Sequence, residues 1–364
     1  MRILEISFME PYGDKGAGVE SYISRLATFL KSRGNIVDIA YATELKNSPS
    51  HPEKVYVPEF IWKAGLAKFY YNLKLYFIVR QNKSDYDIIH INGDNGILIP
   101  YINGVKTLMT LHGSIAETVK LRSRKFSLKW LASYILDSID GFLENGSCRK
   151  SKKIISVSEH TAEYFRKATG RNDIKIINTC IPPPGKTNKN LKILGKIKDS
   201  GNTILLWIGR DPVRKGLNIA KRAIIGIDNV TLVTAGYKDE ASQENVINLG
   251  YVNDSLLHGI YEIGDIILFP SSNEGFSIGL LEAMSYGCIP VAFSIPSINE
   301  LLENAKNGFI ANNEEEFHEN LNFLIKNKSI LEEIRPNVIS RASDYYCDKI
   351  LPIVYDVLEE LNQS

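Results

Sequence analysis

Two glutamates eight residues apart, Glu274 and Glu282, stand in the segment of this sequence that offers most chemistry. An apolar strand at residues 266–269 precedes the segment, and its second half has helical periodicity. This pattern predicts Glu274 in a loop and Glu282 in the first turns of a helix. Free amides at a helix start favour a phosphate, whereas carboxylates accept hydrogen bonds from groups such as sugar hydroxyls. The plainer interpretation is a surface helix with solvated glutamates.

A second segment, Trp207 to Gly216, joins another apolar strand to a helix and carries basic residues. Arg210 and Lys215 are predicted at the end of that strand, aimed at the same edge of a sheet. An arginine fork and a lysine point charge both suit a diphosphate. Arg214, by contrast, is expected to be an ordinary surface residue.

Strands alternate with helices along the whole chain, which predicts parallel sheets covered on both faces. The predicted strands cover residues 3–8, 36–41, 88–91, 107–111, 154–157, 203–208, 230–234, 266–269 and 289–293, and two of the predicted helices cover 19–31 and 217–225. Three prolines at 182–184 interrupt the pattern before it starts again. We therefore expect two α/β domains with a cleft between them, where ligands bind at the strand ends.

The two segments together resemble the retaining glycosyltransferases of family 4, which have the GT-B fold. The E-x7-E pair of Glu274 and Glu282, with the trailing Glu-Ala-Met-x-x-Gly-x-x-Pro-Val, carries most of the resemblance. The Gly-Arg-x4-Lys-Gly stretch from Gly209 adds to it. Two first-half motifs also fit: a glycine loop of Gly16, Ala17 and Gly18, and His112 after a strand.

This resemblance implies two Rossmann-like parallel-sheet domains facing across a cleft. It places an acceptor-binding domain at residues 1–181, a linker at 182–201 and a nucleotide-sugar-binding domain at 202–342. Residues 343–364 would form a C-terminal helix that packs back on the first domain. The implied activity is transfer of a sugar from a UDP- or GDP-sugar to a glycan or lipid-linked acceptor, with retention of configuration.

The resemblance also implies roles for individual residues. Arg210 and Lys215 would neutralise the leaving diphosphate, Glu274 would contact the sugar, and His112 would lie near that sugar. Gly16, Ala17 and Gly18 would form the loop near the diphosphate or acceptor. The donor-binding set would be Gly209, Tyr251, Val252, Gly275, Phe276, Ser277, Ile278 and Glu282, with Tyr251 and Val252 at the base and Glu282 at the ribose.

Ser277 departs from the family pattern, because the family often has glycine there. Its hydroxyl could donate to a phosphate, or it could cap the helix that follows. The family motif before the linker and the residue after His112 also differ, since the chain has Asn178-Thr-Cys-Ile and Gly113.

Charge is distributed unevenly although the net charge is only +1. Residues 1–180 hold 26 Lys and Arg against 18 Asp and Glu, whereas residues 181–364 hold 17 against 24. The net charge close to zero argues against a strongly basic, nucleic-acid-binding protein. Two stretches of the first half suit an anionic membrane surface: one runs from Phe60 to Arg80, with Trp62, Phe69, Tyr70, Tyr71, Tyr76, Phe77, Lys63, Lys68 and Lys74, and the other has Lys120, Arg122, Arg124, Lys125, Lys129 and Trp130. The alternative is helices that pack on the sheet with lysines reaching outward.

No metal or other cofactor is expected. Asp85-Tyr86-Asp87 resembles a metal motif of the GT-A fold, but it precedes a strand instead of following one. The glycines at 16 and 18 lack the third glycine of a dinucleotide fingerprint. Cys148, Cys180, Cys288 and Cys347 form no metal or redox motif, so we expect buried free thiols. The absence of a signal-like start or a long apolar run predicts a cytoplasmic protein. The two basic and aromatic stretches predict peripheral contact to the inner face of the cell membrane.

Four other functions fit the same residues less well. A GT-B sugar-nucleotide epimerase or a sugar phosphorylase would use the same phosphate-binding groups. A sugar-nucleotide sensor without catalysis would bind donors and release no product. A two-domain sugar receptor would share the architecture, but such receptors usually carry a secretion signal.

Overall fold

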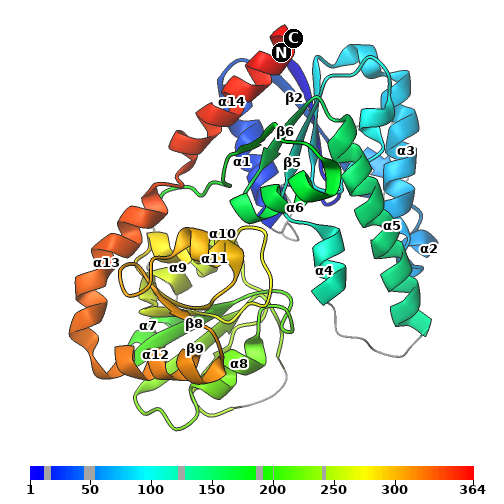
Figure 1. The fold of residues 1–364 in the computed structure, drawn as a ribbon. Coiled ribbons are helices and arrows are strands. Elements are labelled where there is room, and N and C mark those ends of the chain that lie inside the picture. The colour runs from blue at the N-terminus through cyan, green and yellow to red at the C-terminus, as the bar shows by residue number, and fades with distance from the viewer. Residues whose placement is uncertain (12–17, 45–53, 122–127, 186–191, 200, 240–242) are drawn as a thin grey trace. The chain divides into compact units, whose positions relative to one another are not determined.

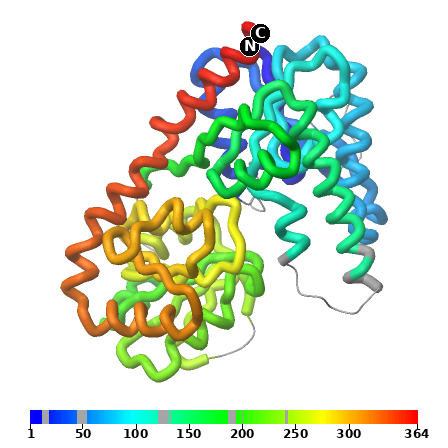
Figure 2. The backbone as a smooth tube through the Cα atoms, in the orientation of Figure 1, coloured from blue at the N-terminus to red at the C-terminus, as the bar shows by residue number. Residues whose placement is uncertain are grey.

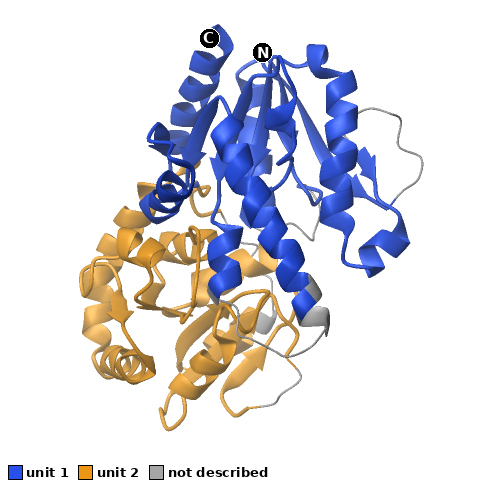
Figure 3. Ribbon diagram, turned by 45° about the vertical axis from the view of Figure 1, so that its right-hand side comes forward, with its two compact units in different colours: residues 1–179, 348–364 blue, residues 180–347 orange. Residues whose placement is uncertain are grey.

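The computed structural model describes residues 1–11, 18–44, 54–121, 128–185, 192–199, 201–239 and 243–364. The chain divides into two compact units (Figure 3). Unit 1 holds residues 1–179 and 348–364, and unit 2 holds residues 180–347. The chain thus leaves unit 1 once and returns to it with its last helix (Figure 2).

The described residues of unit 1 form a seven-stranded parallel sheet in the order β3-β2-β1-β4-β5-β6-β7. Its strands are β1 Arg2–Ile6, β2 Ile36–Thr43, β3 Lys54–Tyr56, β4 Ile88–Asn92, β5 Thr107–Leu111, β6 Lys153–Ser156 and β7 Ile174–Ile176. The helices of this unit are α1 Gly18–Ser32, α2 Glu59–Lys63, α3 Ala67–Gln81, α4 Ile115–Leu121, α5 Leu128–Lys150, α6 Glu159–Thr169 and α14 Cys347–Gln363, with short 3-10 turns at Lys83–Asp85 and Ile99–Tyr101. Helices flank both faces of the sheet (Figure 1).

The described residues of unit 2 form a six-stranded parallel sheet in the order β10-β9-β8-β11-β12-β13. Its strands are β8 Thr203–Ile208, β9 Val230–Ala235, β10 Val246–Asn248, β11 Ile266–Phe269, β12 Ile289–Phe293 and β13 Phe309–Ala311. The helices are α7 Lys192–Lys198, α8 Leu217–Ala223, α9 Asp254–Ile263, α10 Ile278–Ser285, α11 Pro296–Leu301, α12 Glu314–Lys326 and α13 Lys328–Ser343. Helix α7 lies within the stretch predicted as a linker.

Burial explains why the central strands are almost continuously apolar. Every residue of β9, β11 and β5 is buried, as expected for parallel strands covered on both faces. Local signals set several helix ends. Ser158 caps α6 by accepting a hydrogen bond from the Thr161 amide, and Gly170 ends that helix with φ of 74°. The predicted central strands are confirmed, with bounds that agree to within about two residues.

The four strands that the sequence pattern missed are short and lie at or near sheet edges. β3, β7, β10 and β13 each have three residues. A run of three residues carries too little periodicity to be distinguished from a loop.

The C-terminal helix α14 belongs to unit 1, and three contacts attach it there. Lys106 Nζ donates to the Asn362 carbonyl at 2.5 Å, and Lys153 pairs with Glu360 at 3.2 Å. The Phe29 and Tyr355 rings meet edge to face, with centroids 6.4 Å apart. The buried face of α14 is apolar, which supplies the packing energy for this return.

The expectation of four free thiols is wrong for two of the cysteines. Cys180 and Cys347 form a disulfide, 167 residues apart in sequence, whereas Cys148 and Cys288 are buried free thiols as expected. The segments around Cys180 and Cys347, where the chain passes between the two units, run side by side. The Ile181 amide donates to the Tyr345 carbonyl, and the Cys347 amide donates to the Ile181 carbonyl. Sequence spacing cannot show such a pairing, because only the fold brings the two segments together.

This disulfide closes a long loop around unit 2, so its removal should destabilise that unit. We expect Cys347→Ser to lower the free energy of unfolding by about 2–4 kcal/mol, as measured by urea denaturation without reductant. With excess reductant the variant and the unchanged protein should denature at nearly the same urea concentration. Equal stability in both conditions would contradict the prediction.

Candidate active site

The predicted donor residues gather on loops at one edge of the unit 2 sheet. β8, β9 and β11 are neighbouring parallel strands, so their carboxyl ends share that edge. The loop after β8 carries Gly209, Arg210 and Lys215, and the loop after β11 carries Glu274 and Gly275. This edge is where open parallel sheets bind ligands.

Glu274 is the centre of the charged contacts at this edge. Its Oε1 lies 2.6 Å from Lys215 Nζ and 2.8 Å from Arg214 Nη1. The Glu274 side chain is only 8% exposed, so its charge depends on these two cations. As predicted, Glu274 lies in a loop, and Glu282 lies in helix α10.

Arg214 corrects the sequence analysis, which assigned it to the ordinary surface. Besides Glu274, its Nη1 donates to the Asn273 carbonyl at 2.9 Å. The Ser272 amide in turn donates to the Arg214 carbonyl at 2.9 Å. Arg214 therefore joins the loop after β8 to the loop after β11. Its neighbours in sequence gave no sign of this, because the partner is 60 residues away.

Lys215 is held from several sides. Trp207 Nε1 donates to the Lys215 carbonyl at 2.9 Å, and the Lys215 ammonium lies 4.7 Å from the centre of the Phe269 ring. Burial lowers the pKa of Lys215, and the Glu274 carboxylate opposes that shift. The side chain is thus a fixed positive charge in a partly desolvated place.

Two glycines let these loops approach each other closely. Gly216 has φ of 66°, and a Cβ there would lie 2.3 Å from the Pro270 carbonyl oxygen. Gly236, after β9, has φ of 92°, and its Cβ would lie 2.8 Å from the Gly209 carbonyl oxygen. Any side chain would push the loops apart and disturb the charged groups.

Helix α10 begins at Ile278, after Gly275, Phe276 and Ser277. Ser277 occupies the cap position without making a side-chain cap hydrogen bond, so capping does not explain this residue. It is buried, and its Oγ has no hydrogen-bond partner in the described part of the chain. A buried hydroxyl without a partner is costly, and an incoming ligand oxygen would satisfy it.

The remaining donor residues border the same edge. Tyr251 is 73% exposed and stands beside Val252 on the turn after Gly250. Asn248, which no sequence motif singled out, shapes this turn: its Oδ1 accepts from the Gly250 amide at 3.0 Å, and its Nδ2 donates to Thr234 at 2.8 Å. Arg210 is exposed, and Glu282 is half-buried in α10.

In unit 1, His112 follows β5, and Gly18 is the first residue of α1. Gly16 and Ala17 lie outside the described residues. His112 Nε2 is 3.2 Å from Asn92 Oδ1, and the Tyr22 ring meets the imidazole edge to face at 5.3 Å. Burial, with a smaller contribution from His90, lowers the pKa of His112 to about 3. The imidazole is therefore neutral at physiological pH.

A buried polar network underlies His112. His90 is fully buried, and its Nδ1 is 2.9 Å from the Glu5 carboxylate. Its Nε2 is 2.7 Å from Thr110 Oγ1. No sequence motif singled out Glu5. A charged residue in an otherwise apolar central strand is the signal that could have shown it.

Asp87 lies at the amino end of β4, and its Oδ2 accepts a hydrogen bond from the Arg2 amide at 2.7 Å. The residues that the structure describes contain no group of three or more His, Cys, Asp or Glu side chains that could hold a metal ion.

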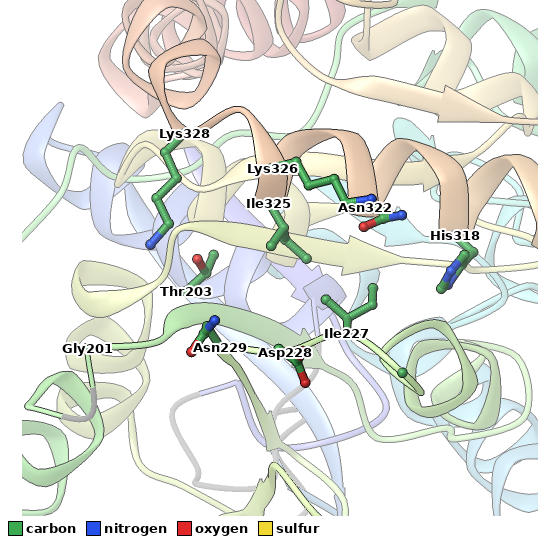
Figure 4. A pocket seen from close by; sticks show the side chains of 11 residues that line it. Gly201, Thr203, Ile227, Asp228, Asn229, His318, Asn322, Ile325, Lys326 and Lys328 are labelled. Carbon is green, nitrogen blue, oxygen red and sulfur yellow. The ribbon is translucent and has the colours of Figure 1, made fainter.

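A separate pocket lies at the opposite edge of the unit 2 sheet. Gly201, Thr203 and Asn229 from the amino ends of β8 and β9 line it together with His318 and Lys326 (Figure 4). None of the predicted site residues borders this pocket. It is therefore distinct from the loops that carry Glu274.

Comparison with known protein families accounts for both units. A model described as "Glycosyltransferase Family 4" matches residues 16–183, and one described as "Glycosyl transferases group 1" matches residues 191–342. A sucrose-phosphate synthase from Thermosynechococcus elongatus has the same fold, with a TM-score of 0.83, 16% identity and coverage of 99% of this chain and 98% of that one. The structure of Anabaena HepE in complex with UDP-glucose has a TM-score of 0.72 at 19% identity, covering 99% of this chain and 100% of that one.

Curated relatives have a higher sequence identity, of 24–25%, but align over only part of their length. An uncharacterized glycosyltransferase from Haemophilus influenzae is 25% identical over 240 residues, which is 62% of this chain and 65% of that protein. The chain thus spans less than two thirds of that relative. A UDP-Gal:alpha-D-GlcNAc-diphosphoundecaprenol alpha-1,3-galactosyltransferase from Escherichia coli is 24% identical over 279 residues, 70% of each chain. From the two family matches and the two parallel-sheet units, the chain belongs to the glycosyltransferases of family 4, with the GT-B fold.

Proposed function

We propose that this protein transfers a sugar from a UDP- or GDP-sugar to a glycan or lipid-linked acceptor, with retention and without a metal ion. The observation that carries the proposal is the Glu274 carboxylate held by Lys215 and Arg214 at the carboxyl edge of the unit 2 sheet. The fixed cations suit the diphosphate of a nucleotide-sugar, and the carboxylate, which accepts hydrogen bonds from hydroxyls, suits its sugar.

In this proposal the leaving diphosphate is stabilised by positive charge that is already in place. Lys215 supplies a partly buried ammonium, and Arg210 adds a guanidinium from the same loop. The amides at the start of α10 and the Ser277 hydroxyl complete the anion site. Such preorganised groups commonly contribute most to the transfer of a charged leaving group.

Glu274 would contact the sugar hydroxyls, and Glu282 the ribose. Both cations contact the same oxygen of Glu274, so the orientation of the carboxylate is fixed before the sugar arrives. The acceptor would attack on the face from which the diphosphate leaves, and the leaving phosphate would take its proton. No side chain then needs to act as a strong base.

The donor can be identified with a panel of UDP-, GDP- and ADP-sugars. We expect one of the UDP- or GDP-sugars to raise the melting temperature and to be hydrolysed or transferred in the presence of EDTA, because protein cations replace a metal. The anomeric configuration of the product, measured by NMR, should equal that of the donor. Donor isomerisation or phosphate-dependent cleavage would instead indicate an epimerase or a phosphorylase, and binding without product would indicate a sensor.

Removing a charge from the site should slow transfer strongly. We expect Lys215→Ala, Arg210→Ala and Glu274→Ala each to lower kcat by about 10²-fold, on the scale of losing one group that stabilises developing charge. Arg222→Ala is the matched control, because Arg222 pairs with Glu314 on the exposed face of unit 2. This control should stay within about twofold of the unchanged enzyme. Near-normal activity of the Lys215 and Glu274 variants would refute the site.

We also propose that unit 1 contacts an anionic membrane surface at the cytoplasmic face. Helices α2, α3 and α5 expose large apolar side chains: Phe60, Phe69, Leu73, Phe77, Leu131, Tyr134, Ile135, Ile139 and Phe142. Among the described residues, no helix is long and apolar enough to cross a bilayer. The name of the Escherichia coli relative includes a diphosphoundecaprenol, which supports a lipid-linked acceptor.

Some residues of the stretch from Phe60 to Arg80 have other partners and are less suited to a membrane contact. Tyr71 belongs to the core, since its hydroxyl donates to the Ser7 and Ala40 carbonyls. Lys63 pairs with Glu59, and Lys68 pairs with Asp94. The apolar side chains, more than these lysines, would therefore enter the interface. Most of the second basic stretch lies outside the described residues.

Flotation with vesicles that contain anionic lipid tests this contact. We expect the protein to float with the vesicles at low salt, and the double variant Phe69→Glu with Phe77→Glu to remain in the soluble fraction, because buried carboxylates oppose insertion. Ile225→Glu is the control, because Ile225 is an apolar residue of unit 2 that is more exposed than Phe69 or Phe77. Equal flotation of all three proteins, or of none, would refute contact through α3.

A further inference from the structure

A chain of hydrogen bonds runs from the first strand of unit 1 to His112. Asn92, the last residue of β4, stands in its middle and is fully buried. Its Nδ2 lies 3.2 Å from Glu5 Oε2 and 3.3 Å from the Ile6 carbonyl oxygen. Its Oδ1 lies 3.2 Å from His112 Nε2.

The partners of Asn92 determine which way its amide points. A backbone carbonyl can only accept a hydrogen bond, so the group that faces Ile6 must be the amide NH2. The Glu5 carboxylate accepts from the same NH2 group. With the NH2 committed to these two oxygens, the Asn92 carbonyl oxygen necessarily faces His112.

That orientation selects one form of the His112 ring. A neutral imidazole carries one proton, and the oxygen of Asn92 accepts only from a nitrogen that bears it. Nε2 must therefore carry the proton, and Nδ1 keeps its lone pair. The depressed pKa of His112 agrees with a neutral ring.

Glu5 itself is held in place, so the chain has a fixed origin. His90 Nδ1 contacts the Glu5 carboxylate at 2.9 Å, and His90 Nε2 contacts Thr110 Oγ1 at 2.7 Å. All three side chains are buried. A buried network with satisfied partners is rigid, and it transmits its geometry to the group at its end.

We propose that Asn92 is a positioning residue that holds His112 as the Nε2–H tautomer, so that Nδ1 accepts a hydrogen bond from a hydroxyl of a sugar substrate. The second half of this statement rests on the proposed function, whereas the tautomer does not. His112 thus serves as an acceptor for a hydroxyl, and it does not serve as an acid. Asn92 acts on the reaction only through the ring that it orients.

The tautomer can be read directly from the full-length protein labelled with 15N-histidine. Long-range 1H–15N correlation spectra distinguish a protonated ring nitrogen from one with a lone pair, and His112→Gln assigns the signals. We expect the unchanged protein at pH 7.5 to show a protonated Nε2 and an unprotonated Nδ1 for His112. A proton on Nδ1, or a mixture of both forms, would overturn the proposal.

Asn92→Ala should release the ring, with shifts that average between the two tautomers. The matched control is Asn72→Ala: Asn72 is another buried asparagine of unit 1 with two hydrogen bonds, to Gly96 and Asp94, and it is not part of this network. We expect the control to leave the His112 shifts unchanged. An unaltered tautomer in a folded Asn92→Ala protein would contradict the role of Asn92.

Kinetics separate the two halves of the proposal. Once a donor is known, Asn92→Ala should lower kcat/KM by about tenfold, the effect of losing one hydrogen bond, while Asn72→Ala stays near the unchanged value. If the tautomer is as expected but Asn92→Ala leaves transfer unchanged, the hydrogen bond to the sugar is refuted and the tautomer stands. If no donor reacts, the proposed function fails, and the ring shifts still test Asn92.

Discussion

A nearly buried carboxylate that must be neutralised organises unit 2. Glu274 lies on the loop after β11, where an isolated charge would cost several kcal/mol in lost hydration. Lys215 and Arg214 reach it from the loop after β8, so the two loops are fixed against each other. Gly216 permits this approach because no side chain fits between it and the Pro270 carbonyl. The pairing that keeps the loops closed thus also leaves positive charge where a diphosphate would sit.

Unit 1 also buries a glutamate, but hydrogen bonds stabilise it in place of ion pairs with lysine and arginine. Glu5 stands in a central strand, and hydrogen bonds from His90 and Asn92 replace the water that it loses. In proteins generally, replacing a buried ionic group by well-packed hydrophobic residues is often neutral or stabilising. The network ends on His112. The hydrogen bonds that stabilise the buried Glu5 therefore also orient the His112 ring through Asn92. In both units a buried glutamate organises polar groups at the carboxyl edge of a parallel sheet.

Much of the fold could be predicted because periodicity is a property of the local sequence. The apolar runs at 107–111, 203–208 and 266–269 are strands with the predicted bounds. Strands of three residues were missed, since they owe their conformation to a neighbouring strand and not to their own pattern. The Cys180–Cys347 disulfide was missed for a related reason: the two residues meet only after both segments have crossed between the units.

The sequence by itself determined which residue types stand after which strands, and hence the family, the parallel sheets and the sheet edge at which we expect the chemistry. Strand order and side-chain partners were decided by the tertiary structure alone. Lys215 was predicted at the site and Arg214 at the ordinary surface, yet the structure shows both in contact with Glu274. The contact of Glu5 with His90 likewise appears only in the folded chain. Hydrogen bonds and ion pairs act over about 3 Å, so their partners are set by packing between distant segments, which no local pattern records.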